Sequence, residues 1–488
     1  MKTEIHISNL SKWFADKILL KNINLHIHSW EKIGIIGGNW CWKTTFLKLL
    51  SWEIKPDNWW IWNRNSIAYM KQEIVCKPET TVYDYLMQHI DHREEYKIYE
   101  MLEKYDVNID INQKVQSLSW WEQKKVDLIA IILQKADVLL LDEPTNHLDQ
   151  KSLDILQETI KQHKWIVLFV SHDRHFLNMM ANKILEVDNS EITIFHGDYE
   201  HYKREKALIY ERQLNEYTVY QKEKQKRETR LNDIRQRASV YVNPARWRLL
   251  RNKEKFFERE ILSNKIDKPT KEKNIYIRAI GGTHQKKLIL EIKNHSIGFW
   301  DKILIEDVWL EVRWHERIQI TWANWSGKTT LIKNIVDCFD KWDKKNTTIW
   351  NNITFEYFDQ QNQDLKSHET VFKRLYKNIK SSANEQSIIS QLAMIWLSQT
   401  EIFESMDKLS YGQRVKVKFL QILSSKIDLL ILDEPTNHLD INTRESIEDM
   451  LEDYDGSLIF VSHDQYFADK VKVNKKYNIS DKKIEIIY

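Results

Sequence analysis

The chain repeats itself, and this repetition limits the possible folds more than any other feature of the sequence. FADKILLKNINL at 14–25 recurs as FWDKILIEDVWL at 299–310, and in each copy a lysine stands 29 residues after the leading phenylalanine. LLLDEPTNHLD at 139–149 returns 291 residues later as LILDEPTNHLD at 430–440. Repeats with such constant spacing predict two copies of one domain, and 488 residues are also more than one hydrophobic core usually holds.

A further repeat extends the match toward the end of each copy. VSHDRHF at 170–176 returns as VSHDQYF at 461–467, again 291 residues later. We therefore expect a first domain over 1–198, a linker over 199–286 and a second domain over 287–488.

Each copy begins with a pattern that is typical of a phosphate-binding loop. A short β-branched run precedes GGNWCWKTT in the first copy and TWANWSGKTT in the second, and helical apolar spacing follows both. In such a loop, backbone N–H groups and a helix N-terminus surround phosphates, a lysine adds charge and a hydroxyl ligates magnesium. The candidate ATP-binding residues are Gly37, Gly38, Asn39, Trp40, Cys41, Trp42, Lys43, Thr44 and Thr45, and in the second copy Trp322, Ala323, Asn324, Trp325, Ser326, Gly327, Lys328, Thr329 and Thr330.

Two acids follow an apolar strand pattern in each copy. Neighbouring strand residues point to opposite faces, so Asp142 and Glu143 can have different tasks, as can Asp433 and Glu434. We expect the aspartates to serve Mg²⁺ and the glutamates to orient and polarise a water, as phosphoryl transfer requires. A lone Asp-Glu pair after a strand can also be a solvated turn, but here it occurs twice at a matching distance.

Between loop and acids lies a serine motif, SLSWWEQ at 117–123 and KLSYGQ at 408–413, with 23 residues from each serine to the aspartate. The whole set resembles the ATP-binding cassette, which has a phosphate loop, an LSGGQ-like signature, an acidic strand end and a switch histidine. The resemblance covers both repeats almost end to end. It implies an α/β fold with a RecA-like core, an antiparallel β edge and a helical subdomain.

The resemblance also implies which residues share each nucleotide. Paired cassettes close head to tail, so one ATP would lie among Lys43, Thr44, Glu143, His172, Ser410 and Gly412. The other would lie among Lys328, Thr329, Glu434, His463, Ser119, Trp120 and Trp121. Glu143, Glu434, His172 and His463 would be catalytic, and Thr44, Gln72, Asp142, Thr329, Gln360 and Asp433 would serve the metal. Phe14 and Phe299 would stack on adenine; the alternative is that they are ordinary residues at strand ends.

The tryptophans of these motifs conflict with the template. Six tryptophans occupy places where the backbone has to approach phosphates and where glycine or another small residue is expected: Trp40, Trp42, Trp322, Trp325, Trp120 and Trp121. The chain has only 10 glycines, about 2% against the usual ~7%, and 20 tryptophans. We interpret most of these tryptophans, with those at 30, 300 and 314, as glycine in the living protein, from UGA codons read under the wrong code. The alternative is that the letters are correct and both sites are degenerate.

The linker is basic and helical in character. Residues 203–273 hold 21 Lys and Arg against 11 Asp and Glu, a net charge of +10, which leaves −8 for the rest of the chain. Residues 203–238 have no Pro or Gly and predict a long helix with an apolar seam at Tyr210, Leu214 and Tyr217. Asn243 and Pro244 predict a turn, after which a second helix resumes. Five arginines lie near this expected tip, and they suit an RNA backbone: Arg235, Arg237, Arg246, Arg248 and Arg251.

Two cassettes separated by such a linker resemble the ABC-F family of ribosome-associated ATPases. The resemblance implies that residues 205–265 contact ribosomal RNA and the P-site tRNA, and that the chain regulates translation or protects ribosomes from antibiotics. Two alternatives stay open: an ATPase module of a membrane transporter, and a degenerate scaffold without hydrolysis. For the linker itself, a solvated coiled-coil face without a partner is also possible.

Cysteine content and hydropathy bear on the compartment. Cys41, Cys76 and Cys338 have no metal-ligand spacing and form no even-numbered framework, which is typical of a reducing compartment. No stretch approaches the roughly 18 apolar residues of a membrane span. We expect a cytoplasmic monomer whose two cassettes pair within one chain.

Overall fold

In the computed structural model, the chain is built from two similar α/β cassettes and a long helix. The described residues are 4–14, 17–38, 42–62, 65–72, 74, 76–105, 107–145, 148, 150–188, 190–240, 248, 251–252, 255–256, 288–299, 302–322, 328–341, 347–349, 353–359, 368–378, 385–395, 397–425, 427–436, 439–462, 464–480 and 483–487.

The first cassette contains a small antiparallel sheet and a larger, mostly parallel one. The small sheet has the order β2-β1-β4, and the larger has the order β5-β6-β7-β3-β8-β9, in which only the β8–β9 pair is antiparallel. The strands are β1 (Glu4–Phe14), β2 (Lys17–His28), β3 (Lys32–Ile36), β4 (Asn58–Trp62), β5 (Ile67–Met70), β6 (Val138–Asp142), β7 (Ile166–Val170), β8 (Lys183–Asp188) and β9 (Glu191–His196).

The second cassette repeats this topology. Its small sheet has the order β11-β10-β13 and its larger sheet the order β14-β15-β16-β12-β17-β18. The strands are β10 (Leu288–Phe299), β11 (Lys302–Arg313), β12 (Arg317–Trp322), β13 (Thr347–Ile349), β14 (Phe355–Phe358), β15 (Leu429–Asp433), β16 (Ser457–Val461), β17 (Lys475–Ser480) and β18 (Lys483–Ile487). The predicted α/β class with two tandem cassettes is confirmed.

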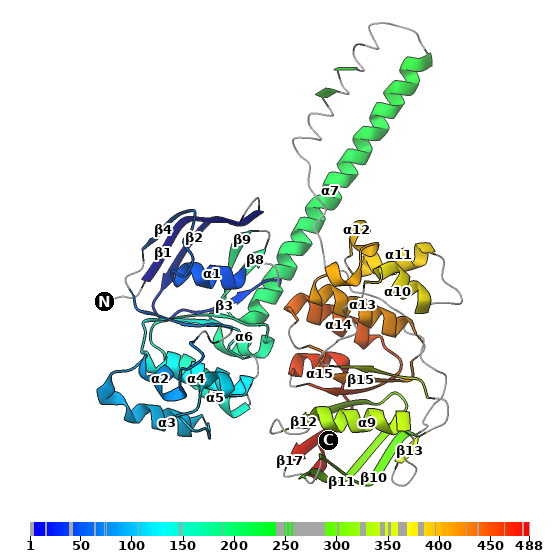
Figure 1. The fold of residues 1–488 in the computed structure, drawn as a ribbon. Coiled ribbons are helices and arrows are strands. Elements are labelled where there is room, and N and C mark those ends of the chain that lie inside the picture. Colours follow the sequence, from blue (N-terminus) through cyan, green and yellow to red (C-terminus); the bar gives the residue numbers. More distant parts are fainter. Residues whose placement is uncertain are drawn as a thin grey trace. The chain divides into compact units, whose positions relative to one another are not determined.

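Helices complete each cassette. The first contains α1 (Lys43–Leu50), α2 (Val82–Met87), α3 (Tyr96–Lys104), α4 (Trp120–Leu133), α5 (Gln150–Gln162) and α6 (Arg174–Met180). The second contains α9 (Lys328–Lys341), α10 (Val371–Asn378), α11 (Glu385–Met394), α12 (Gln399–Ile402), α13 (Tyr411–Ser424), α14 (Ile441–Glu452) and α15 (Gln465–Val471). Within the first cassette, α2 and α3 lie at the end opposite the small antiparallel sheet (Figure 1).

The central strands explain why the sites lie where they do. β6, β7, β15 and β16 are buried along their whole length, which is typical of parallel strands covered on both faces. Their apolar residues contribute to the core clusters of the two cassettes. Because such strands are rigid, the polar residues directly after them are held at one edge of the sheet.

Residues Glu200–Lys273 form a separate compact unit from the cassettes. Helix α7 (Tyr199–Val240) begins just before this unit and covers the helix predicted over 203–238; its 42 residues would span about 60 Å. Tyr210, Leu214 and Tyr217 are half-buried, as the predicted seam requires. The predicted turn at Asn243 and Pro244, and most of the second helix, lie outside the described residues.

Candidate nucleotide-binding site

The loop lysine of the first cassette lies at the end of a buried strand. β3 leads into Gly37 and Gly38, and α1 begins at Lys43. The Lys43 ammonium donates to the backbone carbonyls of Gly37 (2.6 Å) and Gly38 (3.2 Å), and only 7% of the residue is exposed. The charge is thus held inside the loop, where a phosphate would bind. Asn39, Trp40 and Cys41 lie outside the described residues.

Two acids, the last residue of β6 and the residue after it, are buried beside this lysine. Asp142 accepts a hydrogen bond from Thr44, the residue after Lys43, and burial raises the pKa of the Asp142 carboxyl. Burial also raises the pKa of Glu143 to about 7, while Lys43 opposes the rise. One carboxyl oxygen of each acid is buried without a hydrogen-bond partner among the described residues. A buried, unpartnered carboxylate oxygen next to a threonine hydroxyl suits a hard cation such as Mg²⁺.

Glu143 also has a strained backbone, and its counterpart has the same one. The φ angle is 52° at Glu143 and 48° at Glu434, in the left-handed region that favours glycine. The Glu143 N–H donates to Val170 (3.0 Å), and the Glu434 N–H donates to Val461 (3.1 Å). Strain of this kind persists where surrounding structure enforces it, and it is frequent at functional sites.

The switch histidine of the first cassette touches both the lysine and the glutamate. His172 Nε2 lies 3.1 Å from Lys43 Nζ and 3.3 Å from Glu143 Oε1. Burial and the charges of Lys43 and Arg444 hold the pKa of His172 well below its ordinary value, so the imidazole is neutral. The side-chain contact with Glu143 is therefore not an ion pair, and the backbone N–H of His172 donates a hydrogen bond to the Glu143 carboxyl. Lys43, Thr44, Asp142, Glu143 and His172 thus form one cluster from three segments of the chain.

The second cassette shows the same frame over fewer described residues. Asp433 ends β15 and is 1% exposed, and Glu434 follows it half-buried. Lys328 and Thr329 begin α9, and their side chains lie outside the described set. The same is true of the side chains of Trp322 and Phe299, and of residues Ala323, Asn324, Trp325, Ser326, Gly327, Gln360 and His463 altogether. Thr330 lies in the first turn of α9.

Both signature serines begin a helix. Ser119 precedes α4 and Ser410 precedes α13, and each forms a capping box with the residue three positions later, Glu122 or Gln413. S-x-x-[E/Q] is the sequence signature of this cap, and it predicts where both helices begin. At Gly412 an added Cβ would lie 3.0 Å from Thr443 Oγ1 of α14. The second signature therefore keeps a glycine where the packing is tight.

Several predicted residues are not brought to the first cluster. Phe14, at the end of β1, is 70% exposed, and Gln72, after β5, is also exposed. Trp120 and Trp121 are the first residues of α4, and their rings lie near Lys124 and Lys125. The assigned roles of these residues remain predictions.

Three tryptophans occupy left-handed backbone positions, where a bulky residue is a genuine outlier. Trp42, the last residue before Lys43, has a φ of 56°. Trp30 has a φ of 71° in the turn closed by the Glu31 N–H and the His28 carbonyl (3.3 Å). Trp52 has a φ of 65° directly after the C-cap of α1, the position where helices most often have glycine.

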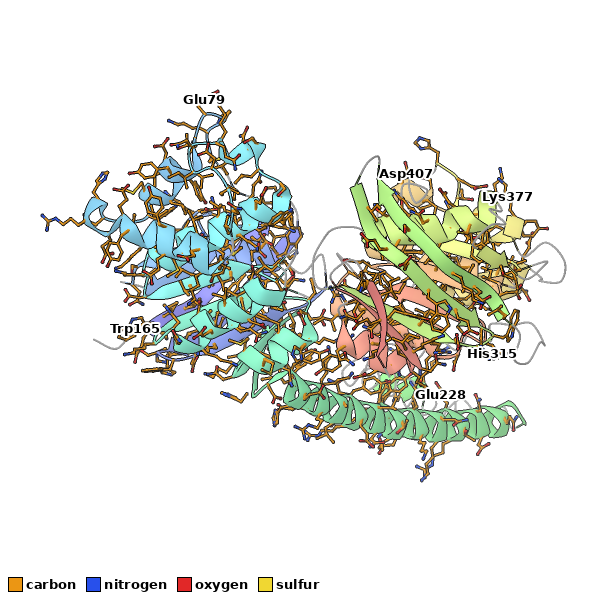
Figure 2. All side chains as sticks on the ribbon, turned by 90° about the horizontal axis from the view of Figure 1, so that it is seen from below. Glu79, Trp165, Glu228, His315, Lys377 and Asp407 are labelled. Carbon is orange, nitrogen blue, oxygen red and sulfur yellow. The ribbon has the colours of Figure 1, made fainter. Side chains whose placement is uncertain are left out.

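The second cassette differs at the turn that corresponds to Trp30. There the left-handed residue is His315, with a φ of 62°, and it is labelled in Figure 2. Its neighbour Trp314 is only 8% exposed and belongs to the core. The backbone thus favours glycine at Trp30, Trp42 and Trp52, whereas at Trp314 the turn makes no such demand, contrary to our reading of that position.

The comparisons with known proteins agree with this geometry. The ABC transporter family model matches residues 20–146 and 305–437. The ribosome protection protein VmlR of Bacillus subtilis is 31% identical over 510 residues, which cover 99% of this chain and 88% of the relative. ABC transporter F family member 2 of Arabidopsis thaliana is 27% identical, over 98% of this chain and 76% of the relative.

A solved structure shares the fold. The structure titled RNase-L Inhibitor superposes with a TM-score of 0.65 at 17% identity, covering 98% of this chain and 90% of that one.

Among the described residues, no helix combines the length and apolarity that crossing a membrane requires. The two cassette matches and the relatives that cover nearly the whole chain show that it belongs to the ABC-F family of ATP-binding cassette ATPases.

Proposed function

We propose that this ATPase acts in the cytoplasm on the ribosome, and that ATP binding and hydrolysis drive a change that regulates translation or protects ribosomes from antibiotics. The similarity to a ribosome protection protein carries the proposal, because it covers 99% of the chain and so includes the linker. The +10 charge of residues 203–273 supports it, since lysines and arginines that neutralise phosphates supply much of the affinity for RNA.

The first cluster supports a division of labour in hydrolysis. The Lys43 ammonium would donate to the phosphates of ATP instead of to the loop carbonyls. Thr44 and Asp142 would hold Mg²⁺. The bound ion would neutralise charge on the phosphates. Glu143 would orient the attacking water and accept its proton. His172 would hold the Glu143 carboxyl through its backbone N–H and the adjacent imidazole.

We propose the same division in the second cassette, from position alone. Lys328 and Thr329 would serve the phosphates and the metal, with Asp433 and Gln360, while Glu434 and His463 would act on the water. Gln72 would complete the first metal site. Ser410 with Gly412, and Ser119 with residues 120 and 121, would each close over the nucleotide of the other cassette.

This mechanism requires small residues in the loops and in the first signature. We propose that positions 30, 40, 42, 52, 120, 121, 300, 322 and 325 are glycine in the living protein, and the left-handed backbones of Trp30, Trp42 and Trp52 support this. Trp300 lies outside the described residues. Sequencing the gene tests it: UGA codons at 40, 42, 120 and 121 agree, and UGG codons contradict it. The intact mass of the native protein is a second readout.

A matched pair of linker variants tests the ribosomal role. The tip variant changes the five arginines Arg235, Arg237, Arg246, Arg248 and Arg251 to Gln. The stem variant removes the same charge from the part of α7 away from the tip, at Lys203, Arg204, Lys206, Arg212 and Lys222. We expect the tip variant to bind purified ribosomes about ten- to a hundredfold more weakly in co-sedimentation, and the stem variant to lose less.

Equal losses in both variants would mean that net charge alone attracts the chain to RNA. Unchanged ribosome binding after deletion of residues 205–265, with ATPase activity retained, would contradict the role of the linker. In that case the ATPase would act on another partner.

A further inference from the structure

A buried arginine of the first cassette is paired with acids of the second. Arg174 is the first residue of α6, and Glu448 lies on α14, 274 residues later. Arg174 Nη1 donates to Glu448 Oε2 at 2.9 Å, and its Nη2 donates to Glu448 Oε1, so the pair is bidentate. Asp464 Oδ2 lies 3.3 Å from Arg174 Nη2. Both Arg174 and Glu448 are almost fully buried, at 2% and 3% exposure.

A second arginine connects this pair to the switch histidine. Arg444, also on α14, donates from Nη1 to the backbone carbonyl of His172 at 2.9 Å. Its Nη1 lies 3.7 Å from Asp464 Oδ2, so the aspartate stands between two arginines. Contacts from α14 therefore reach the histidine that touches Lys43 and Glu143.

Because this network is buried, losing one of its charged groups should be costly. Burial alone would lower the pKa of Arg174, but Glu448 and Asp464 raise it above the ordinary value, so the guanidinium remains charged. A planar guanidinium that binds a carboxylate through two parallel bonds is both strong and specific in direction. Removing one partner of a buried pair leaves the other charge uncompensated, which is strongly unfavourable.

The corresponding positions on α15 and α5, which would form the reciprocal pair, lack these charges. An offset of 291 places Gln465 opposite Arg174, Gln157 opposite Glu448 and Leu153 opposite Arg444. Gln465 is exposed, and its amide donates to Asp469 of its own helix at 2.7 Å. Only the aspartate is kept: Asp173 and Asp464 both cap the helix that follows them.

We propose that Arg174, Glu448, Asp464 and Arg444 form a positioning network that holds His172 beside Glu143 only while the second cassette packs against the first. The first ATP site is then coupled to cassette packing through the switch segment, and the second site is not coupled in this way. The consequence for hydrolysis rests on the proposed role of His172, whereas the network itself does not.

Hydrogen exchange of the nucleotide-free chain tests the network without any catalysis. We expect the amides of 171–176 to exchange at least about tenfold faster in Glu448→Gln than in the parent chain. The matched control, Gln157→Ala, changes the corresponding position on α5 and is expected to leave 461–467 and 171–176 unaltered. Unchanged exchange at 171–176 in Glu448→Gln would overturn the proposal, whether or not the chain hydrolyses ATP.

Single-site backgrounds test the consequence for hydrolysis. With the second site silenced by Glu434→Gln, Arg174→Gln is expected to lower kcat at least about tenfold while changing the KM for ATP less than about threefold. Arg174→Lys, which keeps the charge but not the planar fork, should recover part of this loss. With the first site silenced by Glu143→Gln, the Arg174→Gln loss should be much smaller.

Equal losses at both sites would refute the selective coupling. If no background turns over ATP, the proposed function fails, and the exchange result still decides on the network.

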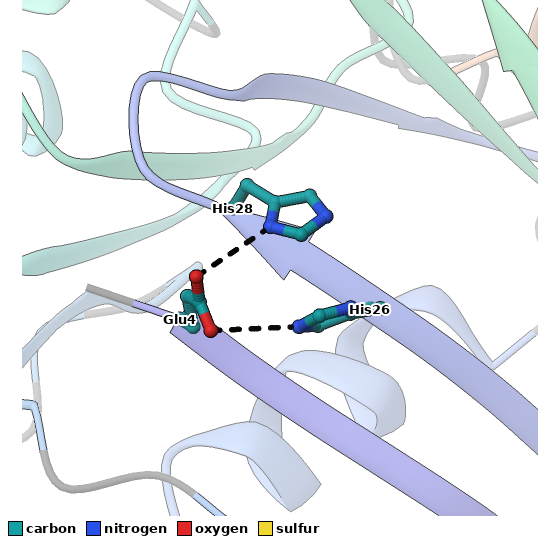
Figure 3. Close-up of side chains that lie close together, drawn as sticks. All are labelled: Glu4, His26 and His28. Carbon is teal, nitrogen blue, oxygen red and sulfur yellow. Dashed lines mark ion pairs between the residues drawn. The ribbon is translucent and has the colours of Figure 1, made fainter. Parts of the chain in front are cut away.

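A different observation carries a second inference, on the small sheet of the first cassette. The antiparallel register places Glu4 opposite His28 and His6 opposite His26, so all four side chains share one face. Glu4 Oε2 lies 3.7 Å from His26 Nε2, and Glu4 Oε1 lies 3.8 Å from His28 Nδ1 (Figure 3). The rings of His26 and His28 are 4.2 Å apart, and those of His6 and His26 are 5.3 Å apart.

We infer that Glu4, His26 and His28 form a site for a divalent transition metal, with His6 as a neighbour. One ligand atom from each of the three lies within 4.8 Å of the others, and the half-exposed imidazoles need only small rotations to converge. Two imidazoles and a carboxylate suit Zn²⁺ or Ni²⁺ better than Mg²⁺, so this site is distinct from the nucleotide sites.

Calorimetry with Zn²⁺ alone, on the metal-stripped full chain without nucleotide, tests this site. We expect one equivalent to bind, and His26→Gln with His28→Gln to weaken binding by at least about a hundredfold, since even indirect contacts are worth ten- to a hundredfold. His196→Gln, an exposed histidine on β9, is the matched control and should bind as the parent does. Absence of saturable binding, or equal binding by the double variant, would overturn the inference.

Discussion

The two switch segments of this chain, 170–176 and 461–467, have the same frame and different contacts. Each begins with a valine whose carbonyl accepts the N–H of the glutamate that follows the neighbouring buried strand, and this glutamate has a left-handed backbone. In both, an aspartate caps the following helix. The residue after this aspartate differs: Arg174 forms a buried pair with Glu448, whereas Gln465 is exposed and bonds within its own helix.

The two copies thus share the candidate site residues of this segment and differ in the contacts that surround them. The lysine, threonine, aspartate, glutamate and histidine that would touch phosphate, metal or water are the same in both copies, because the reaction would fix their type. Residues that transmit contact between cassettes are free to diverge. We therefore expect two ATP sites that use the same groups and respond differently to cassette packing.

The largest expected effect separates the chemistry of the two sites. Glu143→Gln and Glu434→Gln should each remove hydrolysis at one site, by about 10²–10⁴-fold, because the amide cannot accept a proton from water. Steady-state hydrolysis by each single variant measures the contribution of the remaining site. Equal residual rates in the two variants would mean that the unequal contacts have no kinetic consequence.

The turns at Trp30 and Trp314 should respond in opposite directions. Trp314→Gly should lower the unfolding free energy of the second cassette by about 3–5 kcal/mol, because it removes a core side chain. Trp30→Gly should raise that of the first cassette by about 1 kcal/mol, because glycine adopts the left-handed backbone without steric cost. Denaturant unfolding followed by hydrogen exchange resolves each cassette. A loss at Trp30 would contradict the strain that we infer there.

The pH dependence of stability should reveal the buried acid of the first site. Folding raises the pKa of Glu143 from 4.5 to about 7, so this group favours the fold below pH 4.5 and costs stability as the pH rises through 7. Relative to the nucleotide-free parent chain, Glu143→Gln should therefore gain about 2 kcal/mol between pH 5 and pH 8. Thermal or denaturant unfolding at the two pH values measures this gain, and a constant difference would contradict the buried state of Glu143.

The smallest expected effect comes from introducing the missing charge pair between the second switch segment and α5. Gln465→Arg with Gln157→Glu restores the two charges at the positions that correspond to Arg174 and Glu448. We expect the amides of 461–467 to exchange a few-fold more slowly than in the parent chain, since an incompletely buried pair is worth about 1 kcal/mol or less. Gln465→Arg alone is the control and should show no protection.

The main features of both cassettes could be predicted from the sequence alone. The loop lysines, the acids after buried strands and the long linker helix follow from spacing and from strand or helix patterns, which are local properties. The neutral state of His172 and the raised pKa of Glu143 were out of reach, because they depend on burial by distant segments.

The network around Arg174 was missed for the same reason. Its partner Glu448 is 274 residues away, and only the difference between VSHDRHF and VSHDQYF indicated that the copies diverge there. The turn at Trp314 was misread although the spacing distinguishes the two residues. Trp30 lies 13 residues before Lys43, and the residue 13 before Lys328 is His315 rather than Trp314. Backbone angles make this distinction and place the demand for glycine at Trp30, Trp42 and Trp52.

Ribosome binding by a chain that cannot hydrolyse ATP tests the central claim most directly. The chain should carry Glu143→Gln and Glu434→Gln, with glycine at positions 40, 42, 120, 121, 322 and 325. We predict that it co-sediments with ribosomes in the presence of ATP and is released when ATP is withheld. Binding that ignores the nucleotide, or no binding at all, would contradict an ATPase whose nucleotide state controls its action on the ribosome.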